Sequence, residues 1–186
     1  MKIFFHASIY GKRFYERQYK AIVEICKTNK NEVYSDHILK RSYHNTDKFT
    51  REDHERDFRK ITNEIKKSDT VIVEGTYPSI GTGHYITIAL SYLKPVLVLY
   101  QKNPHGILVG DPNRLLFLEK YNINDLDGLN KKITKFILIA KKKTLKNRFN
   151  LMLDNEMVEF LNVQAKKLNL SKADLIRQMI SEKIKN

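Results

Sequence analysis

Three short apolar runs separated by amphipathic stretches constrain the fold of this chain more than any other feature of its sequence. The runs are Ile3 to Ala7, Thr70 to Glu74 and Pro95 to Tyr100. Runs of this kind are typical of strands that are buried on both faces of a parallel sheet. Parallel neighbours need long crossovers, so the stretches between the runs are expected to be helices. The sequence therefore predicts an α/β fold up to about residue 140.

The most economical arrangement is an open, mostly parallel sheet of the Rossmann or flavodoxin type, flanked by helices. Ligands bind such sheets at the C-terminal ends of the strands, which places a site near 7–11, 74–83 and 100–110. The other elements expected in this part are a helix through Tyr15 and Cys26, a strand at Val33 to Leu39, a helix after the capping residue Thr50, a helix at His84 to Leu93, a strand at Leu115 to Leu118 and a helix from about Leu126 to Ala140.

The pattern changes after residue 140. Residues 141–147 carry four lysines and are interpreted as a basic linker. In residues 148–154, Phe149, Leu151 and Leu153 fall on one face and Arg148, Asn150 and Met152 on the other, which predicts a strand. Two helices are expected next, at about 156–168 and 171–185, with Asn169 ending the first in a left-handed conformation. One strand and two helices make too small a core to be stable alone, so a partner chain is expected to complete it.

Charge narrows the classes of partner. The formal net charge is +13. The last 46 residues carry eleven basic and five acidic side chains, so their net positive charge per residue is about three times that of the first 140 residues. Such an excess favours a polyanionic partner. The single cysteine, Cys26, excludes an intrachain disulfide, and the apolar run at the N-terminus is too short for a signal peptide or a membrane span. We therefore expect a cytoplasmic protein without a membrane partner, and no cofactor or metal is indicated.

The C-terminal segment 148–186 resembles the ribbon-helix-helix family of DNA-binding proteins in its order of strand, helix, Asn-Leu-Ser turn and helix. The resemblance implies a homodimer, or a larger even-numbered oligomer, whose paired strands enter the major groove of duplex DNA. The alternative interpretation is a dimerisation hairpin with an ordinary solvated face. The residues assigned to DNA are Arg148, Asn150 and Met152 for base edges and Ser171 and Lys172 for phosphates.

The first 140 residues resemble the nucleoside 2-deoxyribosyltransferase family, particularly its 2'-deoxynucleoside 5'-monophosphate N-glycosidase branch. The matching pieces are FFHASIYG (4–11), SDTVIVEGTYPSIGTGHY (68–85) and KPVLVLY (94–100). In that branch, the first loop and the P-S-x-G-x-G element hold a 5'-phosphate of the nucleotide ligand at a helix N-terminus. A tight strand-to-helix turn without a ligand is the alternative. The phosphate-binding residues implied here are Ser8, Gly11, Ser79, Gly81 and Gly83.

The catalytic residues of the branch are only partly matched. Its nucleophilic glutamate, in a G-Y-E sequence, corresponds to Tyr85 in the sequence GHY, and a branch tyrosine corresponds to Phe4. A neutral phenol is a poor substitute for a carboxylate, although some glycosidases use tyrosine as the nucleophile. The remaining carboxylate candidates are Glu74 at a strand end and Asp57 in an H-E-x-D stretch, one helical turn further from Asp69 than in the family. His84 and His6 are the candidate bases, and each is equally interpretable as a structural residue.

Two functions from different classes follow. The first is a dimeric DNA-binding protein whose α/β domain binds a nucleotide with impaired catalysis, acting as a ligand-responsive regulator. The alternative is an active nucleotide N-glycosidase or deoxyribosyltransferase of the toxin or phage-defence type, tethered to DNA or repressed by the C-terminal module. A scaffold that binds neither ligand is the third possibility. The expected organisation is a nucleotide-binding domain at 1–140, a linker at 141–147 and a DNA-binding module at 148–186.

Overall fold

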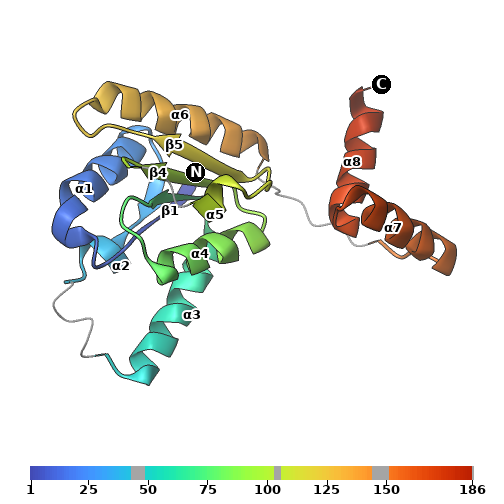
Figure 1. Ribbon diagram of the computed structural model, residues 1–186, viewed down its shortest axis with the longest axis horizontal. Helices are drawn as coiled ribbons and strands as arrows, with labels where there is room; N and C mark the ends of the chain where they lie inside the picture. The colour runs from blue at the N-terminus through green and yellow to red at the C-terminus, as the bar shows by residue number, and fades with distance from the viewer. Residues whose placement is uncertain (43–48, 103–105, 144–150, 186) are drawn as a thin grey trace. The chain divides into compact units, whose positions relative to one another are not determined.

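A five-stranded parallel sheet lies at the centre of the N-terminal part of the chain (Figure 1). The computed structural model describes residues 1–42, 49–102, 106–143 and 151–185. It divides into two units, Met1–Leu145 and Lys146–Asn186. All strand pairs are parallel, so the predicted α/β fold is confirmed for the first unit.

The strand order fixes where a ligand site is expected. The sheet has the order β2-β1-β3-β4-β5. The chain therefore leaves β1 toward one edge and returns on its other side at β3, which makes the gap between these two strands the topological switch point. The strands are β1 (Lys2–Ala7), β2 (Glu32–Tyr34), β3 (Thr70–Glu74), β4 (Val96–Tyr100) and β5 (Leu116–Lys120).

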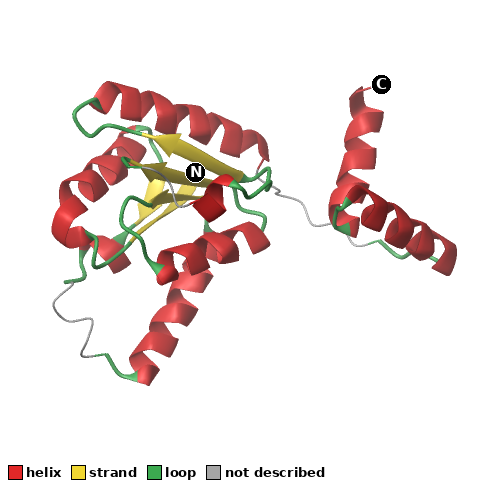
Figure 2. Ribbon diagram, in the orientation of Figure 1, coloured by secondary structure: helices red, strands yellow, loops and turns green. Residues whose placement is uncertain are grey.

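Helices cover both faces of the sheet (Figure 2). On one face, α1 (Lys12–Thr28) and α6 (Leu126–Lys143) pack on side chains such as Phe5 and Ile72. On the other face, α3 (Arg51–Lys67) and α4 (Ile80–Ser91) pack on Phe4, Val71 and Val73. Alternate residues of one strand point to opposite faces, so β1 and β3 each contribute to both cores.

Several boundaries differ from the sequence-based expectations. The stretch expected as a strand at 33–39 is a three-residue strand, β2, followed by the short helix α2 (Asp36–Leu39). Ser79 accepts a hydrogen bond from the Thr82 amide and starts α4 four residues earlier than expected. A short helix, α5 (Gly106–Val109), was not expected, and α6 continues through Lys143, into the stretch interpreted as linker.

The second unit contains α7 (Asn155–Leu168) and α8 (Lys172–Lys185). Asp154 caps α7 through the Met157 amide (2.8 Å), and Asn169 ends the helix in the left-handed region (φ 52°), as the sequence predicted. The described part of the expected strand, 151–154, is not a strand in the single chain, because a β-ladder needs a neighbouring strand. Among the described residues, no helix is long and apolar enough to cross a membrane.

Candidate functional site

The candidate site lies at the C-terminal ends of β1 and β3, where the strand order changes direction. Ala7 pairs with Glu74 in the last register position of these two strands. The segments that follow the two strands therefore start side by side. These are the first loop, 8–11, and the loop before α4, 75–79.

The first loop is closed by its own hydrogen bonds. The buried Ser8 hydroxyl accepts from the Gly11 amide (3.3 Å), and the Tyr19 hydroxyl donates to the Ser8 carbonyl (3.0 Å). A Cβ at Gly11 would lie 2.5 Å from the Tyr19 hydroxyl and 2.7 Å from the Tyr77 Cβ. This close approach requires glycine and presses the first loop against the loop that follows β3. The structure thus places the two predicted phosphate-binding segments next to each other.

The second of these segments begins a helix. Ser79 is the N-cap of α4, and the amides in the first turn of a helix have no partner within the helix. Gly81 and Gly83 are exposed, and a Cβ at Gly83 would meet nothing within 4 Å. The backbone at the start of α4 is therefore open to a ligand. An anion fits such a helix start, because the amides point at it and the helix dipole favours negative charge.

Aromatic and imidazole rings gather on the α3/α4 face of the sheet beside this helix start. His6, on β1, and His37, on α2, form a hydrogen bond 3.1 Å long between Nδ1 of His6 and Nε2 of His37, and their rings are parallel. Phe4 and Tyr34 stack on His37 at centroid distances of 4.8 and 5.4 Å. The Tyr85 ring contacts His6 edge to face at 4.9 Å. The rings form one continuous cluster from α2 to α4.

Burial keeps both histidines neutral at physiological pH. It lowers the pKa of His6 from 6.5 to about 3. The pKa of His37 is well below its usual value, first because of burial and then because the nearby His6, Arg41 and Lys60 disfavour another positive charge. The pair therefore carries no charge, and one of its two facing nitrogens donates an N–H to the lone pair of the other.

The charge of Asp57 acts on the phenol of Tyr85. Burial raises the pKa of Tyr85 above 10, and the negative charge of Asp57 raises it further. Asp57 forms an ion pair with Arg41, and both side chains are about three-quarters buried (25% and 28% exposed). Phe58, the next residue on α3, stacks against the Tyr85 ring at 6.4 Å. Asp57 is one helical turn further from Asp69 in sequence than in the family, but it still acts electrostatically on Tyr85.

Glu74 faces the other side of the sheet. Its Oε1 accepts hydrogen bonds from the Tyr121 hydroxyl (3.1 Å) and from the Thr76 amide (3.2 Å) and hydroxyl. The side chain is fully buried, and this burial raises the pKa of its carboxyl despite the three donors. Glu74 alternates with Val73, which packs in the α3/α4 core, so it does not share a face with Tyr85. The structure does not bring these two catalytic candidates together.

Four buried polar atoms in the described part of the chain have no partner: His37 Nδ1, Glu74 Oε2, Thr82 Oγ1 and Thr62 Oγ1. His37 and Thr82 belong to α2 and the first turn of α4, whereas Glu74 points to the opposite face of the sheet. Buried polar groups are nearly always hydrogen-bonded, so the orphaned Thr82 hydroxyl at the start of α4 calls for an explanation such as a ligand or bound water.

The other predicted residues divide between the site and its surroundings. His84 is exposed and stacks on Phe58 (5.8 Å), so it lies at the rim and not inside the ring cluster. Within the described ranges, no three His, Cys, Asp or Glu side chains are grouped so that they could hold a metal ion.

Sequence reasoning missed three residues of the site: His37, Arg41 and Lys12. The Nζ of Lys12 donates to the Leu39 and Arg41 carbonyls (both 2.7 Å). No spacing signal identifies them, because they meet the site only through the fold.

The residues assigned to DNA are only partly described. Arg148 and Asn150 lie outside the described residues. Met152 is 96% exposed. At the start of α8, the Ser171 hydroxyl accepts from the Asp174 amide (3.1 Å) and donates to its carboxylate (2.8 Å), while Lys172 is exposed.

The chain is similar to known proteins over most of its length. A protein of Methanosarcina barkeri named "Putative 2'-deoxynucleoside 5'-phosphate N-hydrolase 1" is 33% identical over 139 residues, which are 74% of this chain and 85% of the relative. A protein of Nematostella vectensis with the same name is 32% identical over 138 residues, covering 69% and 90% of the two chains. The solved structure of the CMP N-glycosidase of Clostridium botulinum matches with a TM-score of 0.49 and 16% identity, over 72% of this chain and 99% of that one. No protein-family model matches the chain.

Proposed function

Because the chain belongs to the 2'-deoxynucleoside 5'-phosphate N-hydrolase family, we propose that its first unit hydrolyses the N-glycosidic bond of a nucleoside 5'-monophosphate. This is the enzyme alternative of the sequence analysis, and it now stands ahead of the regulator with impaired catalysis. The observation that carries it is the approach of the two loops at the switch point, where a Cβ at Gly11 would lie 2.7 Å from the Tyr77 Cβ beside the start of α4. Thr82 Oγ1, a buried atom without a partner in the first turn of α4, supports a polar ligand there.

In this proposal, the 5'-phosphate binds at the start of α4. The Ser79 hydroxyl and the Gly81 amide supply donors, Gly83 leaves room for the ligand because its own amide donates to the Ser79 carbonyl, and the first loop with Ser8 and Gly11 closes the other side. A phosphate there needs no basic side chain, because helix-start amides and hydroxyls are sufficient donors. This arrangement would orient the sugar toward Tyr85, which is on the second turn of the same helix.

The chemistry requires negative charge beside the anomeric carbon, which becomes positive as the base departs. Asp57 is the carboxylate that acts on Tyr85 electrostatically, whereas Glu74 faces the opposite side of the sheet. We assign charge stabilisation to Asp57. Tyr85, held as a neutral phenol by its raised pKa, has the role of a hydrogen-bonding group at the sugar or the attacking water, and Arg41 positions Asp57 through the ion pair.

Base release from nucleotides tests this proposal. Asp57→Asn is expected to lower kcat by at least about 100-fold through loss of transition-state charge stabilisation. Ser79→Ala is expected to raise KM for monophosphates about tenfold while leaving the slow cleavage of unphosphorylated nucleosides unchanged. Glu55→Gln is the matched control, because Glu55 is an exposed α3 residue that pairs with Arg51. Equal loss in the control, or full activity in Asp57→Asn, would contradict the assignment.

A second function is proposed for the second unit: dimerisation through a second copy of this chain, followed by binding of duplex DNA. The supporting observation is its exposed apolar surface. Among its described apolar residues, Leu161, Ala165 and Leu175 alone are buried, with Leu153 and Ile176 packed against them. The apolar side chains left exposed in the described part of this unit include Leu151, Met157, Phe160, Val163, Met179 and Ile180.

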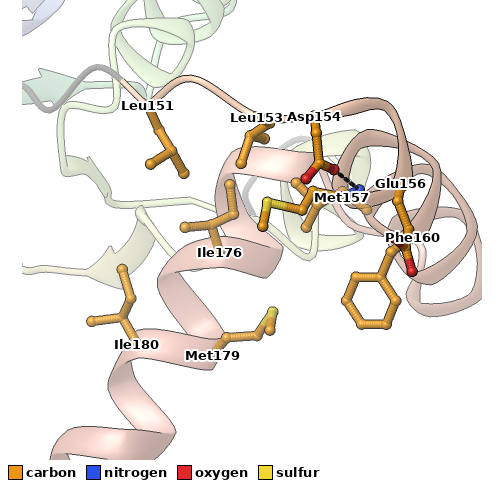
Figure 3. Close-up of a pocket in the computed structure, with 10 residues that line it drawn as sticks. Leu151, Leu153, Asp154, Glu156, Met157, Phe160, Ile176, Met179 and Ile180 are labelled. Atoms are coloured by element: carbon orange, nitrogen blue, oxygen red, sulfur yellow. Dashed lines mark hydrogen bonds between the residues drawn. The ribbon is translucent and has the colours of Figure 1, made fainter.

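All of these side chains except Val163 line a groove (Figure 3). A cavity of about 600 Å³ lies between the segment at 151–154 and the two helices, lined by Leu151, Met157, Phe160 and Ile180 among others. Leu151 and Leu153 line the groove, while Met152 between them is exposed. This alternation is that of a strand, although the segment has no strand partner in the single chain. A second copy would supply both the strand partner and the cover for the apolar surface.

DNA binding by this dimer is tested with the full chain. Arg148→Ala is expected to weaken specific binding by about 1–3 kcal/mol, and Lys172→Ala to reduce the salt dependence of binding with little change in sequence preference. If a chain truncated after residue 140 bound duplex DNA as tightly as the full chain, the assignment to the second unit would be wrong.

A further inference from the structure

The hydrogen-bonded pair of His6 and His37 is a feature that the proposed roles of Asp57 and Tyr85 do not use. Both rings are neutral, and they form a hydrogen bond 3.1 Å long between Nδ1 of His6 and Nε2 of His37. His6 sits at the C-terminal end of β1 and contacts the ring of Tyr85. The pair therefore reaches the residue that faces the sugar in the proposed function.

The unpartnered atom of the pair identifies its tautomer. His37 Nδ1 is buried and has no hydrogen-bond partner. A buried N–H without an acceptor is rarer in proteins than an acceptor with a free lone pair. The proton of His37 is therefore on Nε2, where it is donated to His6 Nδ1. His6 must then carry its own proton on Nε2, which makes this nitrogen a hydrogen-bond donor.

A donor at this position complements the proposed reaction. When the C1′–N bond breaks, its electron pair goes to the departing base, and water supplies the oxygen to C1′. One proton of that water remains on the new hydroxyl and the other ends on the released base. The base thus gains negative charge in the transition state. A neutral imidazole N–H can stabilise such charge by hydrogen bonding without first becoming an imidazolium.

We propose that His6 donates a hydrogen bond from Nε2 to the departing nucleobase, and that His37 is a positioning residue that keeps the proton on this nitrogen. The inference rests on the proposed N-glycosidase function and adds a leaving-group subsite to it. Phe4 and Tyr34, stacked on the His37 ring, hold that ring in the orientation the hydrogen bond requires.

The test compares two leaving groups with the full-length protein. A 2'-deoxynucleoside 5'-monophosphate has a leaving base that needs stabilisation, whereas 4-nitrophenyl 2-deoxyriboside 5-phosphate releases a stable nitrophenolate. His6→Phe keeps a ring against Tyr85 but removes the donor. It is expected to lower kcat for the nucleotide at least about 100-fold and for the nitrophenyl compound less than about fivefold. His37→Phe should show the same selective loss at about tenfold, and His37→Gln, whose amide can donate to His6 Nδ1, should restore most of it.

The outcomes separate this inference from the function on which it rests. An equal loss on both compounds would make His6 structural and overturn the inference while the N-glycosidase function stands. No release of either leaving group by the wild type would overturn both. His54→Phe, a change at an exposed histidine on α3, should alter neither rate more than twofold. If His6→Phe fails to fold, ¹⁵N NMR of the wild type decides: a protonated Nε2 on His6 supports the inference, and a protonated Nδ1 overturns it.

Discussion

Glu74 and Tyr85 show how the position of a single residue within its element decides its role. Both are suggested by the sequence as replacements for a missing nucleophile, and both lie at the C-terminal end of the sheet. Glu74, however, points to the α1/α6 face, where Tyr121 and Thr76 donate to it, while Tyr85 contacts His6 on the α3/α4 face. Glu74 is better explained as the buried acceptor that ties the loop after β3 to Tyr121.

Variants at Glu74 distinguish these roles. Glu74→Ala leaves the Tyr121 hydroxyl and the Thr76 amide without their acceptor and opens a cavity, so the free energy of unfolding should fall by about 2–5 kcal/mol. Glu74→Gln keeps an acceptor oxygen and removes the cost of burying a charge, so it should change stability by less than about 1.5 kcal/mol and retain activity. Urea unfolding and an activity assay check both. Loss of activity in a stable Glu74→Gln protein would return Glu74 to the catalytic candidates.

The lowered pKa of His6 predicts an acid-sensitive fold. The folded state holds His6 neutral down to about pH 3, whereas an unfolded histidine binds a proton below about pH 6.5. The unfolded state therefore binds more protons in this window, and stability is full above pH 6.5 and falls as the pH is lowered. Between pH 7 and pH 5 the wild type should lose about 2 kcal/mol more than His6→Phe, measured by urea unfolding. Parallel losses would show that His6 is not held neutral by the fold.

At the scale of elements, the sequence predicted those whose signals are local. Continuous apolar runs identified β1, β3 and β4, and Thr50 with Asp53, Asp154 and Asn169 marked helix ends. The failures have non-local causes. The segment 33–39 begins and ends with apolar side chains, which favoured a strand, but Ile38 packs into the α1/α6 core as part of a helix. The His6–His37 pair could not be predicted, because only this packing brings together two residues that are 31 positions apart.

The end of α7 offers a test at this scale. Asn169 has a φ of 52°, a conformation that glycine adopts freely, that asparagine tolerates, and that costs most other residues with a Cβ about 1 kcal/mol or more. Asn169→Gly should leave the amide protection of α7 and α8 unchanged, whereas Asn169→Ala should lower their opening free energy by about 1 kcal/mol. Hydrogen exchange of the full chain measures this. Asn162→Ala, on the exposed side of α7, is the control, and a similar change there would argue against the capping explanation.

At the scale of the whole molecule, two units with different physical needs share one chain. The first buries two full cores on the faces of its sheet. The described part of the second buries three apolar side chains and leaves many more exposed, which is the reason for proposing that a second copy completes its core. The net charge of +13 does not distinguish the units. Residues 146–186 carry eight basic and five acidic side chains, so the net charge per residue of the second unit is about equal to that of the first. The excess expected after residue 140 comes in part from Lys141, Lys142 and Lys143, which belong to the end of α6 in the first unit.

Association through the second unit is therefore expected in solution. Phe160→Glu and Ile180→Glu place charges in the apolar groove and should lower the oligomeric mass of the full chain at micromolar concentration. Lys183→Glu, an exposed change on α8, should leave the mass unaltered. Sedimentation equilibrium separates these results. A wild-type chain that is monomeric throughout this range would contradict the proposed pairing.

The most direct test of the N-glycosidase proposal is real-time ¹H NMR of the wild-type protein with a panel of 2'-deoxynucleoside 5'-monophosphates. The account predicts that at least one member is converted to free base and 2-deoxyribose 5-phosphate in equal amounts, and that the corresponding unphosphorylated nucleoside reacts at least tenfold more slowly. If nucleotides bind, as seen by shifted resonances, but no base is released above the uncatalysed rate, the unit is a nucleotide-binding module and the proposed enzyme function is wrong.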